Sequence, residues 1–132
     1  ADAGNINHVC ALSAFWVGLM YDDHSLNAAI ELTKKISSEE LVELRNIVPS
    51  KGLNSKLDKL DLYQLASEVI SISKDGLTRR NNLNKDNLDE SCYLKYLEDI
   101  IGAKKNPADN LIEKFKNNWN EDISKIYENC RF

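Results

Sequence analysis

The sequence predicts an all-α fold of six to seven helices, and three observations lead to this class. Apolar residues recur at helical spacing along most of the chain, while no stretch shows the period-two alternation of a half-buried strand. Capping side chains precede several of the apolar stretches. The length of 132 residues suits one compact domain, so residues 1–132 are assigned to a single helical region.

The first predicted helix, Val9 to Tyr21, is apolar on nearly every side. Such a helix is normally buried over most of its surface, and a small bundle supplies few neighbours to bury it. The stretch is also well short of the roughly 20 residues that a membrane span needs. We therefore expect a buried core helix and no membrane span.

Polar residues mark where the later helices begin and end. Ser37 with Glu40 forms a capping-box pattern. Asn106 before Pro107 is typical of a helix start. Gly76 is expected to weaken or bend the longest helix. The predicted elements are a second helix from Asp22 to Lys35, a third from Ser38 to Ile47 stopped by Pro49, an ordered loop from Pro49 to Lys59, a long helix capped by Asp61, a mobile loop from Asn81 to Glu90, a helix from Cys92 to Ile101, one from Pro107 to about Trp119, and a short one from Asp122 to Tyr127.

Charge and cysteine content narrow the environment and the partners. With 17 basic against 21 acidic residues, the chain has no overall field that would draw it onto nucleic acid or an anionic membrane. Its three cysteines are widely spaced, lack zinc-binding spacing and fit a reducing compartment. We expect a cytoplasmic protein with no metal in this segment. A disulfide between two of the cysteines, such as Cys92 with Cys130, is the alternative that the sequence leaves undecided.

Two polar clusters are candidate sites, each with a simpler alternative. Asp22, Asp23 and His24 offer ligands to a divalent cation, but acids at a helix start also complement its dipole, and capping is favoured. Arg79 and Arg80 either present guanidinium groups to a phosphate or carboxylate or form a solvated helix end, which composition favours. No catalytic motif accompanies them, so these residues by themselves indicate a helical domain without a catalytic centre.

The run from Ala14 to Asp22 carries a family resemblance. It resembles a nearly identical run in glutamate–cysteine ligases of the plant and alphaproteobacterial type. Other segments fall in the family's order: Ala1-Asp2-Ala3-Gly4, Cys10-Ala11-Leu12, Val48-Pro49 with Gly52-Leu53, Lys74-Asp75-Gly76-Leu77 with Arg79-Arg80, and Pro107-Ala108 with Leu111-Ile112. The similarity runs from Ala1 almost to Phe132 and resembles the C-terminal third of such an enzyme.

The resemblance implies an activity whose reactive groups lie elsewhere. The family joins the γ-carboxyl of glutamate to the amine of cysteine, through a γ-glutamyl phosphate formed from MgATP, in glutathione biosynthesis. Its metal-binding acids, glutamate-binding arginines and antiparallel catalytic sheet belong to an α+β fold and match positions before Ala1. The resemblance therefore implies no catalytic residue, no metal ligand and no cofactor for the isolated chain. Only Asp2, which matches an acid after the catalytic strand, is carried over as a substrate-binding residue at the active-site rim.

Three functional hypotheses follow. In the leading one, the chain is the helical C-terminal part of the ligase, is inactive alone, and packs its Val9 to Tyr21 helix against the catalytic sheet of the remainder. In the second, it is a stand-alone interaction module derived from the enzyme, which uses the same apolar surface to bind another protein or to self-associate. In the third, it is the complementing subunit of a split enzyme.

Overall fold

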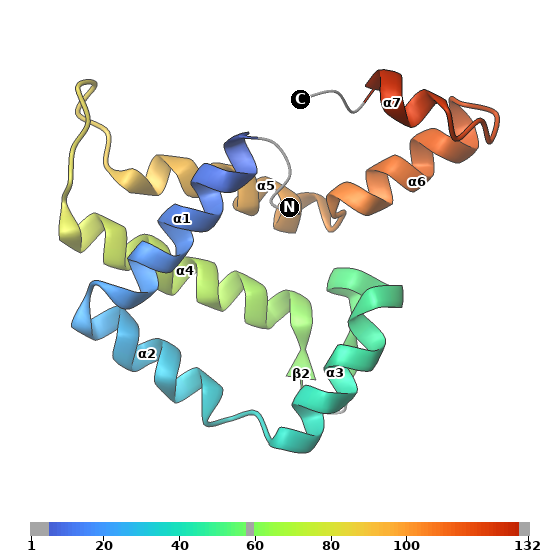
Figure 1. The fold of residues 1–132 in the computed structure, drawn as a ribbon. Helices are drawn as coiled ribbons and strands as arrows, with labels where there is room; N and C mark the ends of the chain where they lie inside the picture. Colours follow the sequence, from blue (N-terminus) through green and yellow to red (C-terminus); the bar gives the residue numbers. More distant parts are fainter. Residues whose placement is uncertain (1–5, 58–59, 130–132) are drawn as a thin grey trace.

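The computed structural model describes residues 6–57 and 60–129, and this part of the chain is almost entirely helical (Figure 1). The predicted all-α class is confirmed. Over these two ranges, seven α-helices, two short 3₁₀ helices and one antiparallel pair of strands follow one another. The elements are α1 (Ile6–Met20), α2 (Asp23–Thr33), α3 (Ser38–Lys51), η1 (Gly52–Asn54), β1 (Lys56–Leu57), β2 (Leu60–Asp61), α4 (Leu62–Arg80), η2 (Glu90–Leu94), α5 (Lys95–Ala103), α6 (Pro107–Asn117) and α7 (Lys125–Asn129).

The core lies where α1 crosses α4, and α2, η2 and α5 pack around this crossing (Figure 1). Ala14, Leu77 and Leu94, from α1, α4 and η2, form the buried apolar cluster. By contrast, α6 and α7 extend away from the body as an arm (Figure 1). Within the described ranges, no helix is long and apolar enough to cross a membrane.

The predicted capping residues hold the starts of three helices. Asp22 accepts a hydrogen bond from the backbone N–H of Ser25 at 2.8 Å, at the start of α2. Ser37 and Glu40 form both bonds of the predicted capping box before α3. Asp61 accepts from the first backbone N–H groups of α4. These side chains satisfy donors that the helix itself leaves free, so the helix starts were readable from sequence.

The prediction that Pro49 ends the third helix is wrong, because α3 continues to Lys51. Pro49 is exposed and lies in the last turn, where its missing N–H removes only one hydrogen bond from the helix. The Ser50 hydroxyl donates to the Ile47 carbonyl oxygen at 2.9 Å in the same turn. The helix ends at Gly52, whose φ of 53° lies in the left-handed region.

The predicted loop from Pro49 to Lys59 is more regular than expected. The end of α3, η1 and β1 occupy much of it, and β1 pairs with β2 so that Lys56 lies opposite Asp61. The ammonium of Lys56 also lies 2.7 Å from the Asp61 carboxylate. Ser55 is fully buried, and its hydroxyl donates to the Gly52 carbonyl oxygen at 2.7 Å.

The segment from Asn81 to Glu90 is mostly non-helical, as predicted. Its fold is a hydrogen-bonded turn, because the side-chain oxygen of Asn84 accepts from the backbone N–H groups of Asp86 and Leu88 at 2.8 and 3.0 Å. The Asn84 backbone N–H also donates to the Leu88 carbonyl oxygen at 2.9 Å. Local side-chain bonding therefore gives this polar segment its own structure.

The long helix α4 runs from Leu62 to Arg80 through Gly76, and the weakening or bend expected at Gly76 stays a prediction. The predicted helix from Cys92 to Ile101 is divided into η2 and α5, and α5 passes Gly102 to end at Ala103. In the arm, the Asn106 capping box and Pro107 start α6 as predicted, while α7 begins three residues later than expected.

Candidate docking surface

The inner side of α1 is made of small residues that let α4 approach closely. Ala11, Ala14 and Gly18 face the crossing and are buried. A Cβ placed on Gly18 would lie 2.2 Å from the Ser73 carbonyl oxygen, and one on Gly76 would lie 2.0 Å from the Gly18 carbonyl oxygen. The two backbones therefore touch, and any side chain at either glycine would push the helices apart.

Two fully buried serines hold this crossing together. The Ser73 hydroxyl donates to the Phe15 carbonyl oxygen in α1, and the Ser25 hydroxyl donates to the Ile72 carbonyl oxygen in α4, both at 2.9 Å. Each polar group is thus satisfied without water. Each serine hydroxyl thus binds a backbone carbonyl of another helix, and the two bonds link α1, α2 and α4.

The outer side of α1 carries large apolar side chains exposed to solvent. Trp16 is 52% exposed and Met20 is 57% exposed. Exposed apolar residues follow helical spacing on the side of α1 away from α4, and we call this set the outer face of α1: Ile6, Val9, Leu12, Trp16 and Met20. The prediction that this helix is buried on most sides is therefore only half right. A contiguous exposed apolar stripe of this kind usually marks a contact surface.

A cluster of charged side chains joins the start of α2 to the last turn of α4. Arg79 donates to one carboxylate oxygen of Asp22 through two nitrogens, at 2.7 and 3.0 Å, and also to the Ser25 hydroxyl at 2.8 Å. The hydrogen bond from Arg79, reinforced by the Ser25 backbone N–H, holds the pKa of Asp22 well below its ordinary value. The same pairing raises the pKa of Arg79. Asp22 therefore stays ionised and serves both as a cap and as an ion-pair partner.

The candidate anion site at Arg79 and Arg80 is not formed as an open pair of guanidinium groups. Arg79 is bound to Asp22, and Arg80 lies 3.6 Å from the Glu90 carboxylate and over the ring of Tyr21. Both cations thus serve contacts within the fold.

The cation-site alternative is likewise not supported. Asp22 is held by Arg79, and in residues 6–57 and 60–129 no group of three or more His, Cys, Asp or Glu side chains is placed to hold a metal ion. Asp2, the carried-over substrate-binding residue, lies outside the described residues.

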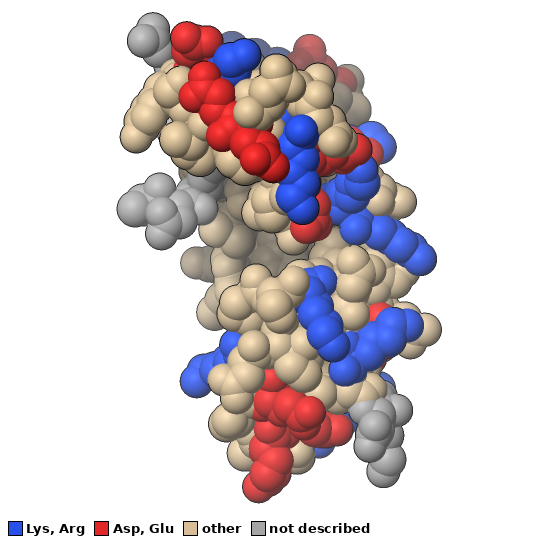
Figure 2. Space-filling model, turned by 90° about the vertical axis from the view of Figure 1, so that its right-hand side faces the viewer, with Lys and Arg blue, Asp and Glu red and all other residues tan. Residues whose placement is uncertain are grey.

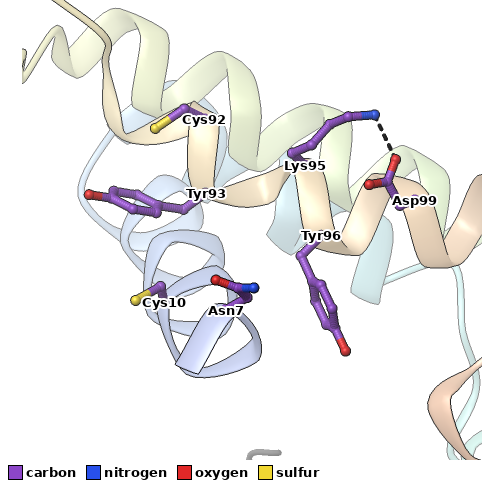
Figure 3. A pocket seen from close by; sticks show the side chains of 7 residues that line it. All are labelled: Asn7, Cys10, Cys92, Tyr93, Lys95, Tyr96 and Asp99. Carbon is purple, nitrogen blue, oxygen red and sulfur yellow. Dashed lines mark hydrogen bonds and ion pairs between the residues drawn. The ribbon is translucent and has the colours of Figure 1, made fainter. Parts of the chain in front are cut away.

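A groove of about 290 Å³ opens between the first half of α1 and the segment formed by η2 and α5 (Figure 3). Asn7 and Cys10 line it from α1, opposite Tyr93 and Tyr96. Lys95, at the same rim, pairs with Asp99 at 2.6 Å. Cys10 and Cys92 both line the groove as free thiols. The groove thus has a polar edge and aromatic walls and adjoins α1.

Sequence reasoning missed the contact between Gly18 and Gly76. A signal was present, because Ala11, Ala14 and Gly18 repeat at the spacing of one helix face. Helical periodicity of apolar residues takes no account of side-chain size, so it did not distinguish this face of small residues.

Comparison with known proteins shows the family of this chain. The family model of glutamate–cysteine ligase family 2 (GCS2) matches residues 1–129. Chloroplastic glutamate–cysteine ligases of Arabidopsis thaliana and Solanum lycopersicum are 35% and 33% identical to this chain over 128 residues, which is 97% of this chain and 23% of each relative. The chain thus spans about a quarter of the length of the curated relatives it matches. It belongs to glutamate–cysteine ligase family 2.

Proposed function

We propose that this chain is the C-terminal helical part of a glutamate–cysteine ligase of the plant and alphaproteobacterial type, which joins the γ-carboxyl of glutamate to cysteine in glutathione biosynthesis. The observation that carries the proposal is the unbroken family match over residues 1–129. A stand-alone interaction module is not favoured, because the whole chain, including its exposed faces, matches enzymes of this family. Asp2 stays in the proposal as a residue at the active-site rim on the resemblance alone.

The chain alone should not be catalytic. The reaction uses Mg²⁺ and ATP, and a phosphoryl transfer of this kind needs metal ligands and free cationic donors at fixed positions. Among the described residues, Arg79 and Arg80 are engaged by carboxylates, and no metal-ligating cluster is present. These residues do not fit MgATP, so we assign its binding to the part of the ligase outside this chain.

The outer face of α1 is the proposed contact with that remainder. About three quarters of the relatives' length lies outside the matched region, which leaves ample protein to cover Trp16 and Met20. Covering large apolar side chains removes them from water and stabilises the assembly. If a second polypeptide supplies the remainder, as in a split enzyme, the same face makes the contact between subunits.

The experiment compares this chain with the full-length ligase in an assay of γ-glutamylcysteine formation from glutamate, cysteine and MgATP. We expect activity from the full-length protein and none above the blank from residues 1–132. In the full-length protein, Trp16→Glu should lower activity about tenfold or more, since a charge is forced into an apolar contact. Ile30→Glu is the control, because Ile30 is 43% exposed on α2 and does not belong to the outer face of α1. Equal effects of the two substitutions would contradict the proposed contact.

The proposed compartment is the cytoplasm, on the cysteine pattern alone. The relatives named above are chloroplastic proteins, so localisation of the tagged full-length protein to a plastid would overturn this part of the proposal.

A further inference from the structure

Among the described residues, the α6–α7 arm, residues 107–129, meets the body at its base. Asn106 lies against Gly52, whose added Cβ would be 2.7 Å from the Asn106 amide nitrogen. Next to it, the ammonium of Lys104 lies 4.7 Å from the ring centre of Tyr63. Beyond this base, the described parts of α6 and α7 make almost no contact with the helices of the body. The arm is therefore placed by its base and is not packed down along its length (Figure 1).

The arm nevertheless has a defined internal structure. The carboxylate of Asp109 and the amide of Asn106 form both bonds of the capping box, each at 2.9 Å. At the other end, Trp119 is only 5% exposed and its backbone N–H donates to the Lys114 carbonyl oxygen at 3.0 Å. Asp122 accepts from Ser124 in the turn before α7. These bonds hold the backbone of the arm at both ends of α6 and in the turn before α7.

Three large apolar side chains of the arm lie largely in water. We define the apolar face of the arm as Ile112, Ile123 and Tyr127, beside which Leu111 and Phe115 are half-buried. Ile112 is 53% exposed, Ile123 is 62% exposed and Tyr127 is 75% exposed, and no residue of α6 is buried. An isolated helix of 11 residues is marginal in water, and most helical stability comes from packing an amphipathic face. The arm therefore needs a further surface to cover this face.

Three observations identify the occupant. The family match continues through α6 and α7 to residue 129, so the arm belongs to the part shared with the ligases. These relatives have about three quarters of their length outside the match, which supplies a surface within the same enzyme. The arm and α3 also form upper and lower lobes with a hollow between them, whose wall is mainly uncharged (Figure 2). A wall with few charged side chains fits the core of a protein interface, where charged residues are depleted.

We infer that the apolar face of the α6–α7 arm docks on the part of the ligase outside residues 1–132, so that the arm and the outer face of α1 are two separate contacts with that remainder. This inference rests on the proposed function, because it requires that a remainder exists. Two contacts on different helices would fix the orientation of the helical part relative to the remainder. A single contact through α1 would let the helical part rotate about that helix.

The test measures whether the arm is covered in the full-length ligase. Ile112→Cys and Asn110→Cys place a thiol on opposite sides of α6, since residues two apart on a helix point in nearly opposite directions. Both positions are exposed in the chain described here. Alkylation by a maleimide, followed at the level of single peptides by mass spectrometry, should be about tenfold slower at position 112 than at position 110. Equal rates at the two positions would overturn the inference.

Two further readouts separate the possible failures. If protection at position 112 disappears on dilution to the monomer, the occupant is a second copy and the inference is overturned. Ligase activity of the unmodified full-length protein is assayed in parallel. An active enzyme whose Ile112→Cys variant reacts freely removes the arm contact and keeps the proposed function. An inactive protein with position 112 protected removes the proposed function and keeps the docking of the arm.

Discussion

The α1–α4 crossing and the α6–α7 arm use their apolar residues in opposite ways. At the crossing, Gly18 and Gly76 bring two backbones into contact, and Leu77 beside them is fully buried. In the arm, the apolar side chain of Ile112 in α6 is 53% exposed to water. The crossing is completed by residues of this chain, whereas the arm leaves apolar side chains in water, where we propose a further contact. The difference teaches that the buried contacts of this chain gather at the crossing, whereas the proposed contacts with the rest of a ligase use exposed faces.

The largest expected difference between the two regions comes from truncating one apolar side chain in each. Leu77→Ala should lower the free energy of unfolding of the 132-residue chain by about 3 kcal/mol, because it removes buried contacts and leaves a cavity. Ile112→Ala should change it by no more than about 0.5 kcal/mol, since that side chain is largely in water. Urea unfolding followed by circular dichroism measures both. Similar losses would mean that the arm is already packed in this chain.

A second comparison tests the close approach of the backbones. Gly76→Ala should cost about 2 kcal/mol, because its Cβ would meet the Gly18 carbonyl oxygen and a backbone atom has little freedom to move. Gly102→Ala is the matched control, as a Cβ there meets nothing within 4 Å, and alanine should stabilise α5 by about 0.5–1 kcal/mol. Thermal unfolding should therefore show a lowered Tm for the first variant and a raised Tm for the second. A Gly76→Ala protein as stable as the parent would contradict the contact.

The buried hydroxyl at the crossing should have a smaller effect. Ser73→Ala removes the hydrogen bond to the Phe15 carbonyl oxygen and should destabilise the chain by about 1 kcal/mol. Ser71→Ala, two residues away on the exposed side of α4, serves as the control and should have little effect. Urea midpoints of the two variants distinguish these outcomes. Equal midpoints would show that the hydroxyl contributes nothing to holding α1.

The smallest expected effect is a dependence on pH at the Asp22 and Arg79 pair. Because the pKa of Asp22 is lowered in the folded chain, its contribution is present above the ordinary aspartate pKa of 3.8 and is lost as the pH falls further, through the folded value. Asp22→Asn keeps an N-cap but removes the charge. The parent should therefore be more stable than this variant at pH 7, and the difference should shrink as the pH falls below about 4. Urea midpoints that differ equally at both pH values would exclude the ion pair as the cause.

Helix starts were predictable because their causes are local. Ser37 with Glu40, Asp61, and Asn106 with Pro107 each act on backbone groups within three residues, so the sequence contains both partners of every bond. Helix ends were less predictable. The continuation of α3 past Pro49 depends on that residue lying in an exposed last turn. The division between η2 and α5 falls at Leu94, whose side chain is fully buried.

For the docking surface, the sequence by itself determined that the first helix is apolar almost all round and that a helix of the arm starts at Asn106 and Pro107. Only the tertiary structure decided that α4 covers the side with Ala11, Ala14 and Gly18 and leaves Trp16 and Met20 outside. The physical reason is that helical periodicity arises from neighbours along the chain. Burial, in contrast, depends on which distant backbone approaches closely enough to exclude water.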